Sequence, residues 1–169
     1  RGKKLYERCM TLLSQIDELH QKGSHDEKEH ISLKTMATIW IDTVSDLIEI
    51  FAMYKWFFST EKAKRFNMKL RLRTAKLGID QKLLRMKYLQ NEIILSQQFI
   101  GDEYPEESFK GLKYEQWYQL FVRYALLIAE YEKDAETAIV IQDIIKQANV
   151  FRGRELEIQL VGLSIGVVC

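Results

Sequence analysis

Tyr114-Glu-Gln-Trp-Tyr-Gln-Leu-Phe-Val-Arg-Tyr-Ala125 is the stretch that determines the expected fold of this chain. Its large apolar residues recur at three- and four-residue steps, and the pattern continues past its end. The positions are Trp117, Leu120, Phe121, Tyr124, Ile128 and Tyr131. Residues spaced in this way share one face of an α-helix, whereas a strand would alternate at every second residue. We therefore predict an amphipathic helix with a buried aromatic face.

The residues that follow predict a second helix that folds back on the first. A short polar turn holds Asp134, a residue type that accepts hydrogen bonds from the free amides at a helix start, and Glu136 falls in the first turn. The small and aliphatic positions of this helix are Ala135, Ala138, Ile139, Ile141, Ile145 and Ala148. Small side chains let two helices approach closely, so we expect an antiparallel hairpin whose second helix ends at Gly153.

The final run, from residue 155 to the end of the chain, fits either of two patterns. Glu155-Leu-Glu-Ile-Gln-Leu160 alternates polar and apolar residues like a strand. Leu156, Leu160, Leu163 and Val167 also fall on one helical face. A lone strand would have no pairing partner, so we predict a third helix.

The spacing around Trp117 is similar to that of a known repeat. Trp117-x-x-Leu120-Phe121-x-x-Tyr124 resembles the tetratricopeptide opening W-x-x-L-G-x-x-Y, with Phe121 in place of the small residue. Ala135 and Ile139 keep the A-x-x-x-F spacing about two residues late, and no proline closes the repeat. In such a hairpin a large ring fills the gap beside small residues, and neighbouring hairpins bury what remains. The expected packing residues are Trp117, Leu120, Phe121, Tyr124, Ala135 and Ile139.

Residues 1–100 predict helices that do not follow this repeat. A first helix runs to about residue 22, a polar loop lies near residues 23–31, and a long second helix spans about residues 32–58. Two more helices are expected, over about residues 60–76 and 80–99. Residues 101–111 hold Pro105, the only proline, and are predicted to be a linker to the hairpin and third helix of residues 112–169.

Composition agrees with one helical unit. The chain has 169 residues, of which 47% are hydrophobic and 29% charged, with a single proline and 8 glycines to interrupt helices. The predicted class is all-α, with antiparallel hairpins stacked as a fragment of a tetratricopeptide-like array. Cys9 and Cys169 make no disulfide framework, which favours a reducing compartment. No run approaches the ~18 apolar residues of a membrane span, and the apolar end Gly166–Cys169 suggests a piece of a longer protein.

Motifs of known chemistry are missing from the sequence. It contains no nucleophile elbow, no glycine-rich phosphate loop and no His-Glu-x-x-His. His20, His25 and His30 are five residues apart, which rotates them off a common helical face, and no cysteine lies among them. We therefore expect a protein that is not an enzyme and has no cofactor, metal or small-molecule substrate.

A basic run is the sharpest charge feature. Seven positive charges fall within fifteen residues, at Lys62, Lys64, Arg65, Lys69, Arg71, Arg73 and Lys76. Three interpretations stay open: a solvated helix face, a site for an acidic protein segment, or a nucleic-acid site that neutralises phosphates. Aromatic residues for base stacking are sparse within the run, so an acidic protein ranks ahead of DNA.

A wider resemblance covers most of the chain. The stretch from Tyr114 to Ala125, the acidic turn, the alanine-containing helix and Arg152-Gly-Arg-Glu-Leu156 resemble the tetratricopeptide subunit of the RNA polymerase III transcription factor TFIIIC. Leu12-Leu13 and the segment from Trp40 to Ile48 are similar to the region after that family's main tandem repeats. Residues 59–111 depart from any repeat pattern.

This resemblance implies a scaffold rather than a catalyst. It implies a nuclear protein that contacts other TFIIIC subunits and TFIIIB subunits through helical surfaces and reaches DNA indirectly, through the complex. It carries over no binding residue by position. Two alternatives remain: a basic nucleic-acid-binding module centred on residues 62–76, and a tetratricopeptide scaffold of an unrelated complex.

Overall fold

The computed structural model describes residues 2–21, 27–53, 57, 83 and 107–168. These residues are mainly helical, which confirms the expected all-α class. The long helices are α1 (Gly2–Gln21), α2 (Glu27–Met53), α5 (Tyr114–Leu127), α6 (Ala135–Gln147) and α7 (Glu155–Val168). The basic run and most of the two helices expected between residues 60 and 99 lie outside the described residues.

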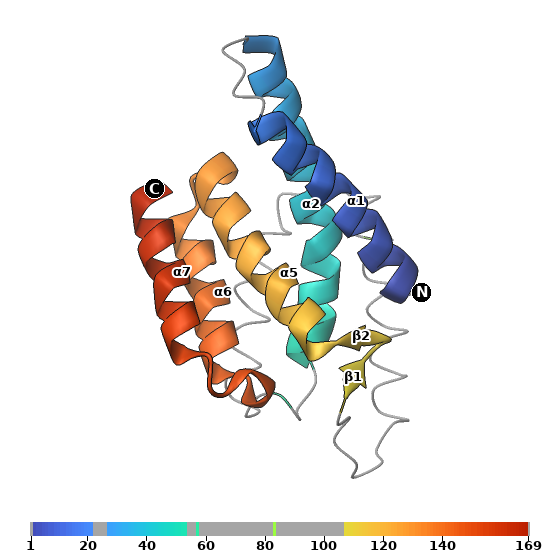
Figure 1. Cartoon of the computed structure of the whole chain (residues 1–169), viewed down its shortest axis with the longest axis vertical. Helices are drawn as coiled ribbons and strands as arrows, with labels where there is room; N and C mark the ends of the chain where they lie inside the picture. Colours follow the sequence, from blue (N-terminus) through green and yellow to red (C-terminus); the bar gives the residue numbers. More distant parts are fainter. Residues whose placement is uncertain (1, 22–26, 54–56, 58–82, 84–106, 169) are drawn as a thin grey trace.

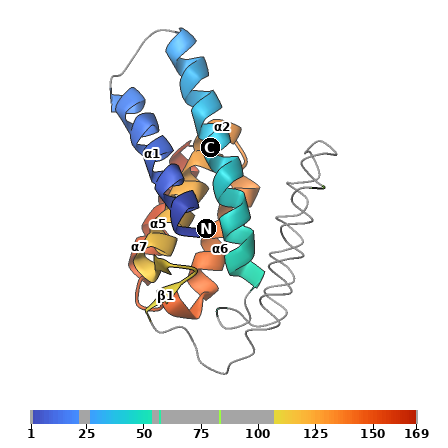
Figure 2. The ribbon, with the colours of Figure 1, turned by 90° about the vertical axis from the view of Figure 1, so that its right-hand side faces the viewer.

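The helices form two groups that meet along α2 and α5. α1 packs against α2, while α5, α6 and α7 pack side by side in chain order (Figure 1). The joined ends of α1 and α2 project beyond the other helices (Figure 2). Within the first pair, the indole Nε1 of Trp40 donates a hydrogen bond of 2.9 Å to the Cys9 carbonyl oxygen, which ties α2 to α1 inside the core.

Two predicted boundaries need correction. α2 begins at Glu27, so residues 27–31, which were expected to belong to the polar loop, are helical. Lys28 and His30 are exposed in this first turn of α2. Polar residues can form such an exposed turn because the later turns of the same helix supply the buried contacts. α6 ends at Gln147 rather than at Gly153. A 3₁₀ turn, Asn149–Phe151, follows it and buries Phe151 in the core.

A small hairpin precedes α5, where the last part of a linker was expected. β1 (Ser108–Phe109) pairs antiparallel with β2 (Leu112–Lys113), with Phe109 opposite Leu112. The two turn residues, Lys110 and Gly111, both have positive φ, as the tightest hairpin turns require. The side chains of Phe109 and Leu112 are buried in the core and anchor the hairpin to it.

α5 continues into a π-helical turn, Ile128–Glu132, which ends at Lys133 in the left-handed conformation. The predicted N-cap of α6 is confirmed, because Asp134 Oδ1 accepts from the Thr137 amide at 3.0 Å. Asp134 Oδ2 also accepts from the Thr137 hydroxyl at 2.7 Å. The chain therefore reverses within a short, well-bonded turn between α5 and α6.

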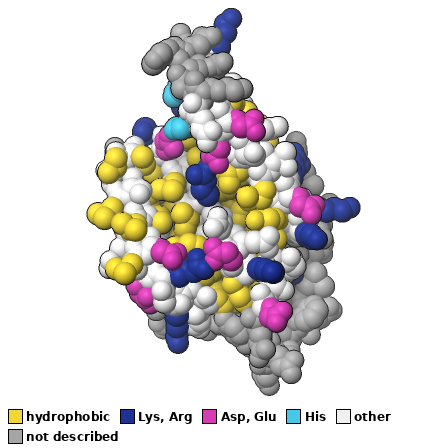
Figure 3. Space-filling view, in the orientation of Figure 1, with side chains coloured by type: hydrophobic (Ala, Val, Ile, Leu, Met, Phe, Trp, Pro, Cys, Tyr) yellow, Lys and Arg dark blue, Asp and Glu magenta, His cyan; other side chains and the backbone are white. Residues whose placement is uncertain are grey.

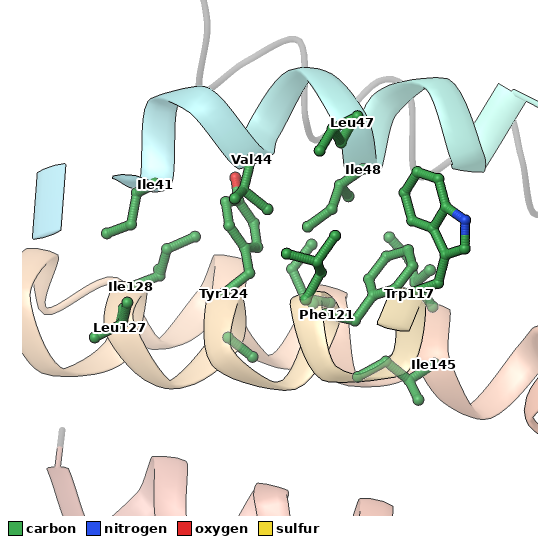
Figure 4. Packing of buried hydrophobic residues seen from close by; sticks show 14 of the residues in the cluster. Ile41, Val44, Leu47, Ile48, Trp117, Phe121, Tyr124, Leu127, Ile128 and Ile145 are labelled. Atoms are coloured by element: carbon green, nitrogen blue, oxygen red, sulfur yellow. The ribbon is translucent and has the colours of Figure 1, made fainter. Parts of the chain in front are cut away.

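An aromatic cluster forms the centre of the core. The Phe51 ring of α2 lies 4.2 Å from Phe57, 5.0 Å from Trp117 and 5.1 Å from Phe121, measured between ring centroids. Aliphatic residues of α2, including Val44 and Ile48, lie over the same face of α5 (Figure 4). Burial of large rings where two helices cross supplies much of the favourable energy of such a core.

Candidate partner-binding surface

The residues of the predicted repeat are placed in two different environments. Trp117, Leu120, Phe121 and Tyr124 are all buried on α5. Trp117 Nε1 donates to the Phe109 carbonyl oxygen at 3.0 Å, and the Tyr124 hydroxyl lies 2.7 Å from Ser45 Oγ. These four side chains are core and are not available to a partner.

The second half of the predicted repeat differs. Ala135 is half-buried, and the Ile139 side chain is 49% exposed, so the packing role expected of Ile139 is corrected. The face of α6 turned to the core instead carries Ala138, Val140, Ile141, Ile144 and Ile145. The helical period places Ile139 on the side of α6 opposite to this buried face, so the repeat spacing does not mark the inner face of the helix.

The basic residues Lys62, Lys64, Arg65, Lys69, Arg71 and Arg73 lie outside the described residues. The three interpretations of that run therefore stay predictions.

Among the described residues, the large apolar side chains with the highest exposed fractions are on α7. Leu156, Leu160, Leu163 and Val167, called here the α7 stripe, are 77%, 63%, 69% and 86% exposed. They lie on one face of the helix, as their spacing predicted. The opposite face buries Ile158, Val161 and Ile165. α7 is thus apolar on both sides, and only one side is covered by described residues.

The α7 stripe runs along an outer edge of the molecule. α7 forms the flank of the α5–α6–α7 layer (Figure 1), and hydrophobic side chains gather at that edge in the space-filling view of the same orientation (Figure 3). Exposed apolar patches of this kind mark interaction sites more often than scattered single residues do. The stripe is therefore the candidate partner-binding surface.

The Gln142 side chain of α6 reaches the backbone of α7. Gln142 of α6 donates from Nε2 to the Ile158 carbonyl oxygen at 3.0 Å. A side-chain carbon at Gly162 would stand only 2.3 Å from the same Nε2 atom. The absence of a side chain at Gly162 makes room for Gln142 and its hydrogen bond to α7.

Charged groups are confined to the ends of α7. At the N-terminal end Arg154 pairs with Glu115 and with Glu157, and its guanidinium carbon lies 4.3 Å from the centre of the Tyr118 ring. The hydrogen bond from Arg154 lowers the pKa of Glu115. At the other end Lys133 Nζ donates to the Val168 carbonyl oxygen at 2.8 Å, a favourable position for a cation.

A second polar cluster joins α1 to the π-helical turn. Arg123 forms an ion pair with Asp17, and His20 Nδ1 lies 3.2 Å from the Tyr131 hydroxyl. Burial raises the pKa of Tyr131 to about 12, and the nearby Glu130 adds to this shift. These side chains link α1 to α5 and to the π-helical turn.

The described residues include neither a metal-binding cluster nor a membrane-spanning helix. Among them, no group of three or more His, Cys, Asp or Glu side chains is arranged to hold a metal ion. Nor does that part of the chain contain a helix with the length and hydropathy to cross a membrane. Burial raises the pKa of the Cys9 thiol to about 11, which disfavours the reactive thiolate.

Stacked helices with an exposed apolar helix face are typical of protein-interaction segments. The sequence is similar to a subunit of a transcription factor. It is 28% identical over 142 residues to the transcription factor tau 131 kDa subunit of Saccharomyces cerevisiae. The match covers 80% of this chain and 14% of the yeast protein. No protein-family model and no solved structure matches the chain.

Proposed function

We propose that this chain is a scaffold segment of the RNA polymerase III factor TFIIIC, which helps to assemble TFIIIB and other TFIIIC subunits at promoters in the nucleus. It acts by holding partners in register and performs no catalysis. The observation that carries the proposal is the similarity to the yeast transcription factor tau subunit, which extends over 80% of the chain. The resemblance around Trp117 to Tyr124 supports the same assignment.

The arrangement of the described helices suits a scaffold. Aromatic contacts in the core join α2 to α5. The two helix groups therefore keep a fixed orientation relative to each other. The α7 stripe then offers an apolar docking surface that needs no change in the fold. The tetratricopeptide arrangement of α5, α6 and α7 is part of the proposal.

Co-purification tests the proposal. The full-length protein, tagged at its own locus and purified from nuclear extract, is expected to bring down TFIIIC subunits together with at least one TFIIIB subunit. A parallel purification from the untagged strain sets the background. If the recovered complex contains neither group, the assignment fails, and a different set of partners would favour a scaffold of an unrelated complex.

A further inference from the structure

We draw no further inference here: the strongest candidate, the cluster of acidic side chains that Asp42, Asp46 and the buried Glu49 form along α2, is a row of carboxylates for which nothing in the described part of the structure shows what covers it.

Discussion

Gly162 and Gly166 occupy the same helix but have different surroundings. At Gly162 a side-chain carbon would meet Gln142 Nε2, the atom that bonds to the Ile158 carbonyl, whereas at Gly166 it would meet open space. The position of the Gln142 side chain against α7 thus depends on Gly162 and not on Gly166. Substituting each glycine by alanine therefore separates the effect of packing against Gln142 from the effect of helix propensity.

We predict that Gly166→Ala stabilises the chain by about 0.5–1 kcal/mol, because alanine is the better helix former. Gly162→Ala gains the same propensity but displaces Gln142 and loses its hydrogen bond, a cost of about 1 kcal/mol. The two variants should therefore differ by about 1 kcal/mol in free energy of unfolding, measured in urea. Equal stabilisation by both would show that Gln142 contributes nothing to the α6–α7 contact.

Cys9 provides a pH-dependent prediction. Burial raises the pKa of its thiol from 9.0 to about 11 in the folded chain. The folded state therefore retains a proton that the unfolded state loses, and this contribution to stability is present below about pH 9 and disappears as pH rises to about 11. Urea unfolding midpoints of the wild type should fall over this window more steeply than those of Cys9→Ala. If the midpoints of wild type and Cys9→Ala fall in parallel with pH, the raised pKa of Cys9 is contradicted.

Alkylation tests the same residue at neutral pH. Because Cys9 is fully buried, iodoacetamide at pH 8 should label it at the rate of unfolding, and urea should accelerate the reaction. Mass spectrometry of the peptide containing Cys9 measures this. Rapid labelling without denaturant would show that α1 separates from α2 in the native state.

At the scale of elements, the basic run of residues 62–76 offers the clearest test of an alternative function. We expect Arg65→Glu, Lys69→Glu and Arg73→Glu together to leave DNA affinity and its salt dependence unchanged, since Phe66 is the single aromatic residue of the run that could stack on a base. Fluorescence anisotropy with a DNA duplex across a salt series measures both. A fall in affinity with a salt slope shallower by about 3 would instead support a nucleic-acid-binding module.

Element boundaries followed local rules where those rules were strong. Asp134 caps α6 as expected, because a carboxylate before a helix bonds to amides three residues on and needs no distant partner. The end of α6 did not follow from the position of Gly153. It depends on the buried Phe151 and on the Asn149 amide, which donates to the Phe57 carbonyl at 3.1 Å across the core.

At the scale of the whole molecule, Phe51 connects the two helix groups. Its ring contacts Trp117 and Phe121 on α5 and stacks on Phe151, 5.8 Å away. We predict that Phe51→Ala lowers the free energy of unfolding by about 3–5 kcal/mol. We also expect circular dichroism and tryptophan fluorescence to give coincident urea transitions in the wild type, because one core serves both groups. Separate transitions would show that the groups unfold independently.

The candidate site was predictable only in part. The spacing of Leu156, Leu160, Leu163 and Val167 placed them on one helical face, but a second apolar face, formed by Ile158, Val161 and Ile165, competes for the core. Periodicity gives equal reason to bury either row. In the structure α7 packs on α6 and α5 with Ile158, Val161 and Ile165 buried, and Gln142 bonds to the Ile158 carbonyl on that side.

The amino-acid sequence by itself determined the helical class, the α5–α6 reversal and the helical state of residues 155–168. Those features depend on interactions within a few turns of one chain segment, which spacing and capping residues reveal. Only the tertiary structure decided that Ile139 is exposed, that residues 108–113 form a hairpin and that the α7 stripe faces outward. These depend on contacts between residues far apart in the chain, and rotation of a helix about its own axis leaves its periodicity unchanged.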